Sequence, residues 1–361
     1  VTIVVEDTRL DVSRLYNYGM FKFNGALLVK FAMGRLWFWV GQQPEYATYE
    51  FYKGQERDVH IYVLNLPPPK RMEVAKYLAW NVRPDNRQYL YHHYFDNCST
   101  RPRDILDKSV NGALHRSTDQ KSKLSLREHT RRFTHHNFFM DLLLMYMMND
   151  DIDQPIENWD AMFLPGELEE AVRNLTYETS SGDERKLVKK RIVYYDADRE
   201  EPPDRAPAHW PWALLMSLVA AAGGLAGARW WQTDRDDTPP RVVFGLYNAF
   251  IGLVLGLPGL MLFVMSIATD HKVTYWNENL FFANPLTFAV LPLGIAIAWG
   301  KKRPVEWLKW IWTALVATGA LGLVLKVVPG FDQQNHLPIV FIYPISIGLA
   351  AALWLLESEP N

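Results

Sequence analysis

The chain has 361 residues, of which 49% are hydrophobic and 22% are charged, and its 38 Lys and Arg against 40 Asp and Glu give a net charge of -2. This balance argues against a nucleic-acid-binding protein, because no basic excess is available to release phosphate counterions. The 14% aromatic content excludes a disordered chain, and the long apolar runs between 210 and 356 exclude a purely soluble one.

The charged part of the chain, residues 1–205, has the pattern of a mixed α+β domain. Runs of β-branched and aromatic residues predict strands at 1–6, 14–23, 36–40 and 59–66. Helices are predicted at 25–33, 70–81, 100–108 and over most of 124–148, and Pro67-Pro68-Pro69 and Pro102 mark two of their starts. An acidic loop is expected at 150–160. We therefore predict an α+β domain over 1–196.

The rest of the chain predicts a membrane domain over 210–361, joined by a polar, Pro-rich linker at 197–209. Apolar runs are found at 211–228, 242–268, 280–299, 310–325 and 337–356. A helix of about 20 residues crosses the roughly 30 Å hydrocarbon layer. Five buried core helices are disfavoured as an explanation, because they would leave almost no polar surface. We predict five membrane-spanning helices.

The loops between these runs differ in positive charge, which predicts their orientation. Two alternate loops are basic and carry Arg229, Arg235, Arg241, Lys301, Lys302, Arg303 and Lys309. The other two loops carry only Lys272 and Lys326. Because Lys and Arg are retained in the cytoplasm, the first span runs from outside to inside. The α+β domain is therefore predicted to lie outside the cytoplasm.

The strongest candidate for chemistry is Cys98, the only cysteine of the chain. It directly precedes a predicted helix, where the helix dipole favours a thiolate, and Arg101 and Arg103 lie nearby in sequence. A thiolate is a nucleophile for acyl transfer. A small buried core residue is the alternative for a lone cysteine. The polar surroundings of Cys98 favour the nucleophile.

The histidines give a weaker signal. His92 and His93 are close to Cys98 in sequence, but adjacent residues of an extended segment point to opposite faces, so at most one approaches the thiol. His60 is expected to be structural. No HExxH motif and no Cys/His cluster occurs in the sequence, so we predict neither a metal site nor a cofactor.

Four motifs together resemble the Lnb family of bacterial lipoprotein N-acyltransferases. They are Tyr16-Asn17-Tyr18-Gly19-Met20, the segment 91–104 with Asp96-Asn97-Cys98-Ser99-Thr100-Arg101, Met162-Phe163-Leu164-Pro165, and Thr269-Asp270-His271 followed by Asn277, Asn279 and Asn284. The resemblance covers nearly the whole chain. It implies a periplasmic domain with a permuted papain-like fold of the NlpC/P60 type, followed by a helical domain in the bacterial inner membrane.

The resemblance also implies a reaction and its partners. Cys98 would accept an acyl chain from a phospholipid as a thioester and pass it to the N-terminal amine of a diacylglyceryl-cysteine lipoprotein. The partners are then a phospholipid donor, a lipoprotein acceptor and the lipid bilayer. Further site residues are expected in three roles: Asn97 or the Cys98 N–H as oxyanion donors, Asp96 and Tyr91 as supporting groups, and Arg101, His271, Asn279 and His336 as lipid or substrate contacts.

One departure from the family concerns the general base. Relatives carry a histidine on the first strand, and a gapless alignment backwards from Tyr16 places it immediately before Val1. We therefore expect the chain to be a fragment. Two other functions stay open: a membrane-anchored cysteine peptidase or amidase acting on peptidoglycan, and a non-catalytic membrane binding protein.

Overall fold

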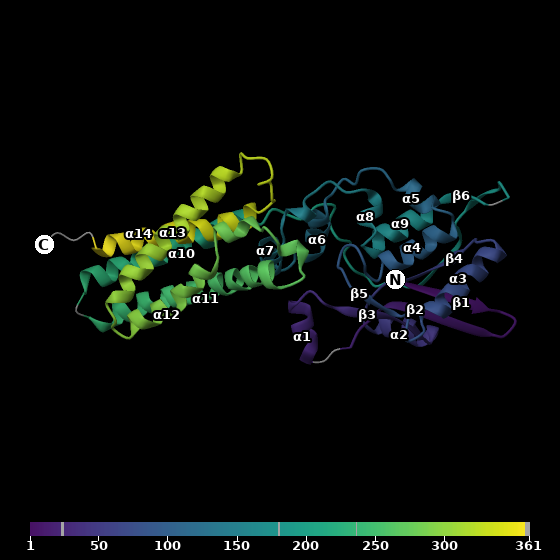
Figure 1. Ribbon diagram of the computed structural model, residues 1–361, viewed down its shortest axis with the longest axis horizontal. Helices are drawn as coiled ribbons and strands as arrows, with labels where there is room; N and C mark the ends of the chain where they lie inside the picture. The colour runs from purple at the N-terminus through teal and green to yellow at the C-terminus, as the bar shows by residue number, and fades with distance from the viewer. Residues whose placement is uncertain (23–24, 180, 236, 358–361) are drawn as a thin grey trace. The chain divides into compact units, whose positions relative to one another are not determined.

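The structure is a computed structural model that describes residues 1–22, 25–179, 181–235 and 237–357, and the chain forms two compact units (Figure 1). The first, here called the α+β unit, comprises residues 1–129 and 155–202. The second, the helical unit, comprises residues 130–154 and the chain from 203 onward. Each unit is described by itself.

The α+β unit is built on a four-stranded antiparallel sheet in the order β1-β2-β3-β5. Its strands are β1 (Thr2–Asp7), β2 (Val12–Met20), β3 (Trp37–Gln43) and β5 (Gln88–Leu90). Two smaller ladders join β4 (Val59–Leu64) to β8 (Val188–Tyr195) and β6 (Thr176–Glu178) to β7 (Glu184–Lys186). The four predicted strands are confirmed, except that Phe23, at the end of the second, lies outside the described residues.

The α+β unit contains the helices α1 (Gly25–Ala32), α2 (Glu45–Gly54), α3 (Pro68–Asn81), α4 (Thr100–Ser109), α5 (Ala113–Ser117), α8 (Asn158–Ala161) and α9 (Pro165–Asn174). Three of them, α1, α3 and α4, match the helices predicted before residue 109. Helix α6 (Leu126–Thr134) crosses the boundary between the units. Proline stands in the first turn of α3 and α9, where its missing N–H costs no hydrogen bond.

One core cluster fixes α4 against the sheet. Tyr16 and Tyr18 of β2 pack with Val40 of β3, Leu78 of α3 and Ile105 of α4, and all five are at most 9% exposed. The Tyr18 hydroxyl donates to Asn81 of α3 across 2.8 Å. This packing brings the beginning of α4 close to the C-terminal half of β2.

The helical unit contains α7 (Phe138–Met147), α10 (Trp210–Thr233), α11 (Thr238–Ala268), α12 (Pro285–Ala298), α13 (Arg303–Leu325) and α14 (His336–Glu357). Short 3-10 turns form η1 (Asp150–Ile152), η2 (Lys272–Thr274) and η3 (Glu278–Phe281). Helices α11 and α12 approach closely at Gly256, where an added Cβ would lie 2.4 Å from the Phe288 Cα.

Within the described residues, α10, α11, α13 and α14 are long and apolar enough to cross a membrane. The predicted span at 280–299 is different. It is a pair of helical segments, Lys272–Phe281 and Pro285–Ala298, bent by 57°. Helix α12 has 14 residues and is about 21 Å long, shorter than the roughly 30 Å hydrocarbon layer. The unit thus has four spans, or five when the bent pair counts as one.

The segment 130–154 differs most from the sequence expectation. It was predicted to continue a helix of the soluble domain, but the helix is interrupted after Thr134, and Asn137 begins α7 by accepting the Met140 N–H at 3.1 Å. Leu142 and Met145 of α7 then pack on residues of α10 and α14. The segment therefore belongs to the helical unit. The predicted domain limits at 196 and 209 stay a prediction.

Candidate functional site

Cys98 lies in a turn two residues before α4, beside the N-cap residue Ser99, and is partly exposed. The N-terminus of a helix carries a partial positive charge, which stabilises an anion placed there. No hydrogen bond joins the thiol to a histidine among the described residues. The predicted place of Cys98 directly before a helix is confirmed, and its role as a nucleophile stays a prediction.

Asn97 holds this turn in place through four hydrogen bonds to the backbone. Its Oδ1 accepts the N–H groups of Ser99 at 2.7 Å and Thr100 at 3.0 Å. Its Nδ2 donates to the carbonyls of His93 at 2.7 Å and Phe163 at 3.0 Å. Both amide hydrogens are therefore used, and the side chain is 4% exposed. Asn97 therefore positions this turn, and with both amide hydrogens engaged its role toward an oxyanion stays a prediction.

The motif Met162-Phe163-Leu164-Pro165 accepts hydrogen bonds from the same turn. The Ser99 hydroxyl donates to the Met162 carbonyl at 2.8 Å, and the next carbonyl, of Phe163, receives the Asn97 amide. Met162 and Phe163 are each at most 2% exposed. Two motifs that are more than sixty residues apart thus form one buried unit around Cys98.

Strand β2 supplies the other side of the site at Gly19. A Cβ added there would lie 3.6 Å from the Cys98 Cβ. The Gly19 N–H donates to Asn17 Oδ1 at 2.9 Å, which fixes the backbone where the β2–β3 ladder shifts register. Gly19 of β2 and Cys98 are therefore close neighbours.

Three aromatic rings, Tyr91, Phe38 and Phe21, stack in a row near Cys98. The Tyr91 ring stacks on Phe38 with centroids 4.3 Å apart, and Phe38 stacks on Phe21 at 5.0 Å. Tyr91, Phe38 and Cys98 belong to one apolar cluster. Burial, and secondarily the neighbouring Cys98, raises the pKa of Tyr91 to about 12. Tyr91 therefore stays protonated at neutral pH, which suits a hydrogen-bond donor and not a base.

Asp96 and Arg101 form a bidentate ion pair at the edge of this turn. The guanidinium donates to the two carboxylate oxygens at 2.5 and 2.6 Å and lies over the Tyr89 ring, 4.5 Å from its centroid. Each side chain is 33% exposed. Asp96 therefore supports Arg101, as expected of a bracing group. A contact between Arg101 and a lipid phosphate stays a prediction.

The histidines near Cys98 are occupied by packing. His92 Nδ1 accepts the N–H groups of Tyr94 and Phe95, each at 3.3 Å. His93 packs edge-on against Phe163, and burial, with the adjacent His92 as a smaller cause, lowers its pKa. His60 lies on the β4–β8 ladder and pairs with Glu169 at 2.9 Å.

The candidate residues of the membrane loops belong to the helical unit, and Asn279 is part of its framework. Its Nδ2 donates to the carbonyls of Met145 at 3.1 Å and Tyr146 at 2.8 Å, and Asn277 Nδ2 donates to Met147 at 3.1 Å. These are last-turn carbonyls of α7, which have no partner within the helix. Asn279 is 0% exposed. Asn279 therefore caps α7, and its predicted contact with a lipid stays a prediction.

A second layer of polar contacts ties the same loops together. Glu278 and Gln333 exchange hydrogen bonds, each backbone N–H donating to the other side chain at 3.0 Å. Lys326 forms an ion pair with Glu278. Asn149, after α7, donates through its side chain to the Tyr275 carbonyl at 3.1 Å. None of these contacts was expected from the sequence, because each joins loops far apart along the chain.

His271 and His336 are the remaining predicted loop residues. His271 is the N-cap of η2, and its carbonyl accepts the Thr274 N–H at 2.9 Å and hydroxyl at 2.8 Å. His336 is the exposed first residue of α14. Their roles toward a substrate stay a prediction. Among the described residues, no group of three or more His, Cys, Asp or Glu side chains is arranged to hold a metal ion.

Two family models match the chain, one in each of its parts. Residues 2–132 match the Lnb N-terminal periplasmic domain, and residues 211–357 match the Lnb transmembrane domain. The chain belongs to the Lnb family. No curated protein and no solved structure is significantly similar to it.

Membership of the Lnb family makes this a membrane protein with a periplasmic type of N-terminal domain, and it points to an enzyme that modifies lipoproteins. The α+β fold and the helical region agree with the two halves of the family. Helix α7 lies between the two matched segments of the chain. The permuted papain-like topology expected for the N-terminal domain stays a prediction.

Proposed function

We propose that this Lnb-family protein is a thiol-dependent lipoprotein N-acyltransferase of the bacterial inner membrane. The observation that carries the proposal is the position of Cys98. Its partly exposed thiol lies at the start of α4, in a turn that Asn97 and the 162–163 carbonyls hold rigid. A fixed thiol beside a helix N-terminus, in a chain that also spans the membrane, suits acyl chemistry on lipids.

The reaction has two displacements. The Cys98 thiolate attacks an ester carbonyl of a phospholipid, a C–S bond forms, the C–O bond breaks, and the lysophospholipid leaves with a proton. The N-terminal amine of the lipoprotein then attacks the thioester and loses a proton. The C–N bond forms, the C–S bond breaks, and the thiolate returns. Each step is easier than one direct transfer from ester to amine.

The developing oxyanion needs a hydrogen-bond donor. Asn97 has none left, but the Cys98 N–H makes no hydrogen bond to any described residue and lies at the helix start. Backbone N–H groups at such positions stabilise negative charge without reorganisation. The Cys98 N–H is therefore the donor in this proposal, with the Tyr91 hydroxyl as a neutral group nearby.

The orientation is proposed from the loop charges. Arg229 lies near the end of α10, Arg235 lies between α10 and α11, and Arg241 lies in the first turn of α11. Lys301 and Lys302 lie between α12 and α13. Positive loops stay in the cytoplasm, so the α+β unit lies in the periplasm. In a Cys98→Ser background, an impermeant thiol reagent should label a cysteine placed at position 272 from outside and spare one at position 302. The reverse pattern would contradict the orientation.

Mass spectrometry of the full-length protein with phospholipid tests the chemistry. We expect an acyl adduct on Cys98 that hydroxylamine removes, and its transfer to a diacylglyceryl lipopeptide. Cys98→Ser should lose both while thermal unfolding stays unchanged. Peptide-bond cleavage without an adduct would favour a peptidase, and full activity of Cys98→Ser would favour a binding protein.

A further inference from the structure

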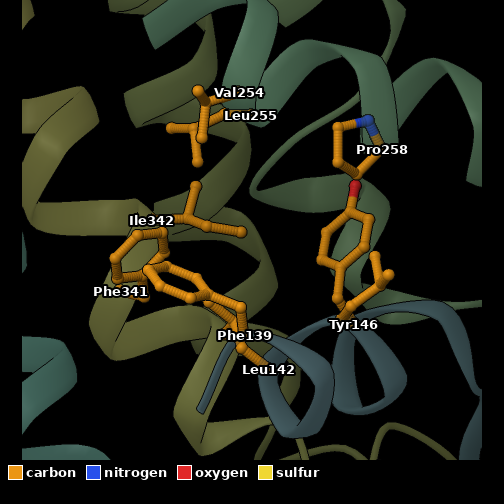
Figure 2. A pocket seen from close by; sticks show the side chains of 9 residues that line it. Phe139, Leu142, Tyr146, Val254, Leu255, Pro258, Phe341 and Ile342 are labelled. Atoms are coloured by element: carbon orange, nitrogen blue, oxygen red, sulfur yellow. The ribbon is translucent and has the colours of Figure 1, made fainter. Parts of the chain in front are cut away.

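The helical unit contains a cavity of about 210 Å³ between α7, α11 and α14. Figure 2 shows Phe139, Phe341 and Ile342 on one side and Tyr146 and Pro258 on the other. The cavity is partly open to the surface of the unit. All its walls belong to segments that neither the motifs nor the proposed chemistry uses.

The lining of this cavity is apolar. Among the described side chains that line it, only Tyr146 has a polar atom, and its hydroxyl already donates to the Ala283 carbonyl at 2.7 Å. Because its lining offers no free polar side chain, the cavity favours apolar molecules over ordered water. Its natural occupant is therefore a hydrocarbon group.

Core packing fixes part of the lining. Leu142 of α7 and Leu255 of α11 are at most 9% exposed and belong to buried clusters. Pro258, inside α11, also lines the cavity, and because proline has no N–H, the Val254 carbonyl one turn earlier lacks its usual partner from residue 258.

Helix α7 lies between the cavity and the surface of the helical unit. Its ten residues span about 15 Å, too few to cross a membrane. Phe139 and Leu143 line the cavity and are 62% and 42% exposed. The single charge of α7, Asp141, is 0% exposed and pairs with Arg131 and His209. The exposed side of α7 at the cavity is therefore apolar, which suits contact with lipid.

We propose that this cavity binds one acyl chain of a bilayer phospholipid, which enters from the side past α7 and α11. The identification of that lipid as the acyl donor rests on the proposed function, but the binding itself does not. A fixed slot of limited volume would also select among acyl chains by length, because each buried methylene adds to the binding free energy only while the cavity has room.

Photo-crosslinking in nanodiscs tests the binding. The full-length protein is mixed with a phosphatidylethanolamine that carries a diazirine on one acyl chain, and labelled peptides are mapped by mass spectrometry. We expect saturable labelling of α7, α11 and α14 at the cavity, competed by unlabelled phosphatidylethanolamine. Labelling that rises linearly with probe and spreads over all lipid-facing helices would overturn the proposal.

Two matched pairs of variants localise the site. Val254 and Leu253 are both 42% exposed on α11, and only Val254 lines the cavity. We expect Val254→Trp to lower saturable labelling about ten-fold, because displacing even two methylene groups costs about that factor. Leu253→Trp should leave it unchanged. Leu143→Trp and Met140→Trp repeat the comparison on α7. Of these two exposed residues, only Leu143 lines the cavity.

The controls separate this inference from the proposed function. Cys98→Ser should keep the labelling, because binding needs no thiol; its failure to transfer acyl chains with labelling intact would leave the cavity site standing. Equal labelling of both members of each Trp pair would reject the site whatever the enzyme does. Competition by a diacylglyceryl lipopeptide but not by phosphatidylethanolamine would reject the phospholipid as occupant.

Discussion

The start of α4 in the α+β unit and the end of α7 in the helical unit are both held by asparagine side chains. At α4, Asn97 accepts N–H groups that the helix cannot satisfy itself. At α7, Asn277 and Asn279 donate to carbonyls that the helix leaves open. An amide carries both a donor and an acceptor, so the same residue type serves opposite helix ends.

The two regions differ in what the asparagines leave free. Beside Asn97, the turn presents the Cys98 thiol and its backbone N–H, neither of which has a hydrogen-bond partner among the described residues. At α7 the amide hydrogens are used for capping, and Asn279 is fully buried. The motif asparagines Asn97 and Asn279 thus fix the backbone around them. The groups that stay available for chemistry are the thiol and the N–H of Cys98.

The largest effect is expected from Asn97. Asn97→Leu removes four hydrogen bonds and leaves the His93 and Phe163 carbonyls buried without a donor, which should destabilise the α+β unit by about 3 kcal/mol or more and abolish acylation of Cys98. Asn97→Asp keeps the acceptors for Ser99 and Thr100 and should be intermediate. Thermal unfolding and adduct formation measure both, and wild-type behaviour of Asn97→Leu would break the comparison.

Asn279 should affect the other unit and leave the thiol alone. Asn279→Leu removes two caps from α7, with an expected loss of about 2 kcal/mol and faster hydrogen exchange of α7. Formation of the Cys98 adduct should change less than transfer to lipopeptide. Exposed His336→Ala is the control for the stability measurement, since a residue at the surface of the same loops should leave α7 protected.

His271 tests whether the loops of the helical unit handle the acceptor. His271→Ala removes an imidazole and keeps the backbone carbonyl that holds η2, so the fold should be preserved. We expect transfer to lipopeptide to fall by about ten-fold, the size of one lost hydrogen bond to a charged group, while acylation of Cys98 is nearly unchanged. Equal losses in both steps would assign His271 to the fold instead.

The smallest effect concerns pH and His93. Its pKa in the folded chain lies below the ordinary value of 6.5, so the unfolded chain binds more protons between these two values. Stability is therefore full above pH 6.5 and falls as the pH drops through that window. In His93→Gln this loss at low pH should disappear, as measured by urea unfolding at several pH values.

Much of the fold could be predicted from local patterns, and the failures have physical causes. Strands β1 to β4 and helices α3 and α4 follow alternation and proline positions. Strand β8 was missed because it is mostly exposed and its partner β4 lies over a hundred residues away in the chain. The break between Thr134 and Asn137 was missed because no proline or glycine marks it.

The candidate site was predicted unevenly for a similar reason. Cys98 could be found because it is the only thiol and directly precedes a helix, which are both local facts. The role of Asn97 could not, because its partners include the Phe163 carbonyl, more than sixty residues further along. Sequence spacing suggested an oxyanion donor, and only the tertiary hydrogen bonds show that both amide hydrogens are engaged.

The sequence by itself determined the division into a charged and an apolar part, the four long apolar helices and the place of the lone cysteine before α4. Apolar length and residue identity do not depend on the rest of the chain. The tertiary structure decided that α7 joins the helical unit, that the 162–163 carbonyls lock the Cys98 turn, and that a cavity lies between α7, α11 and α14. Each of these features depends on contacts between segments that are far apart in the sequence. A local sequence pattern does not indicate which distant segment will pack against it.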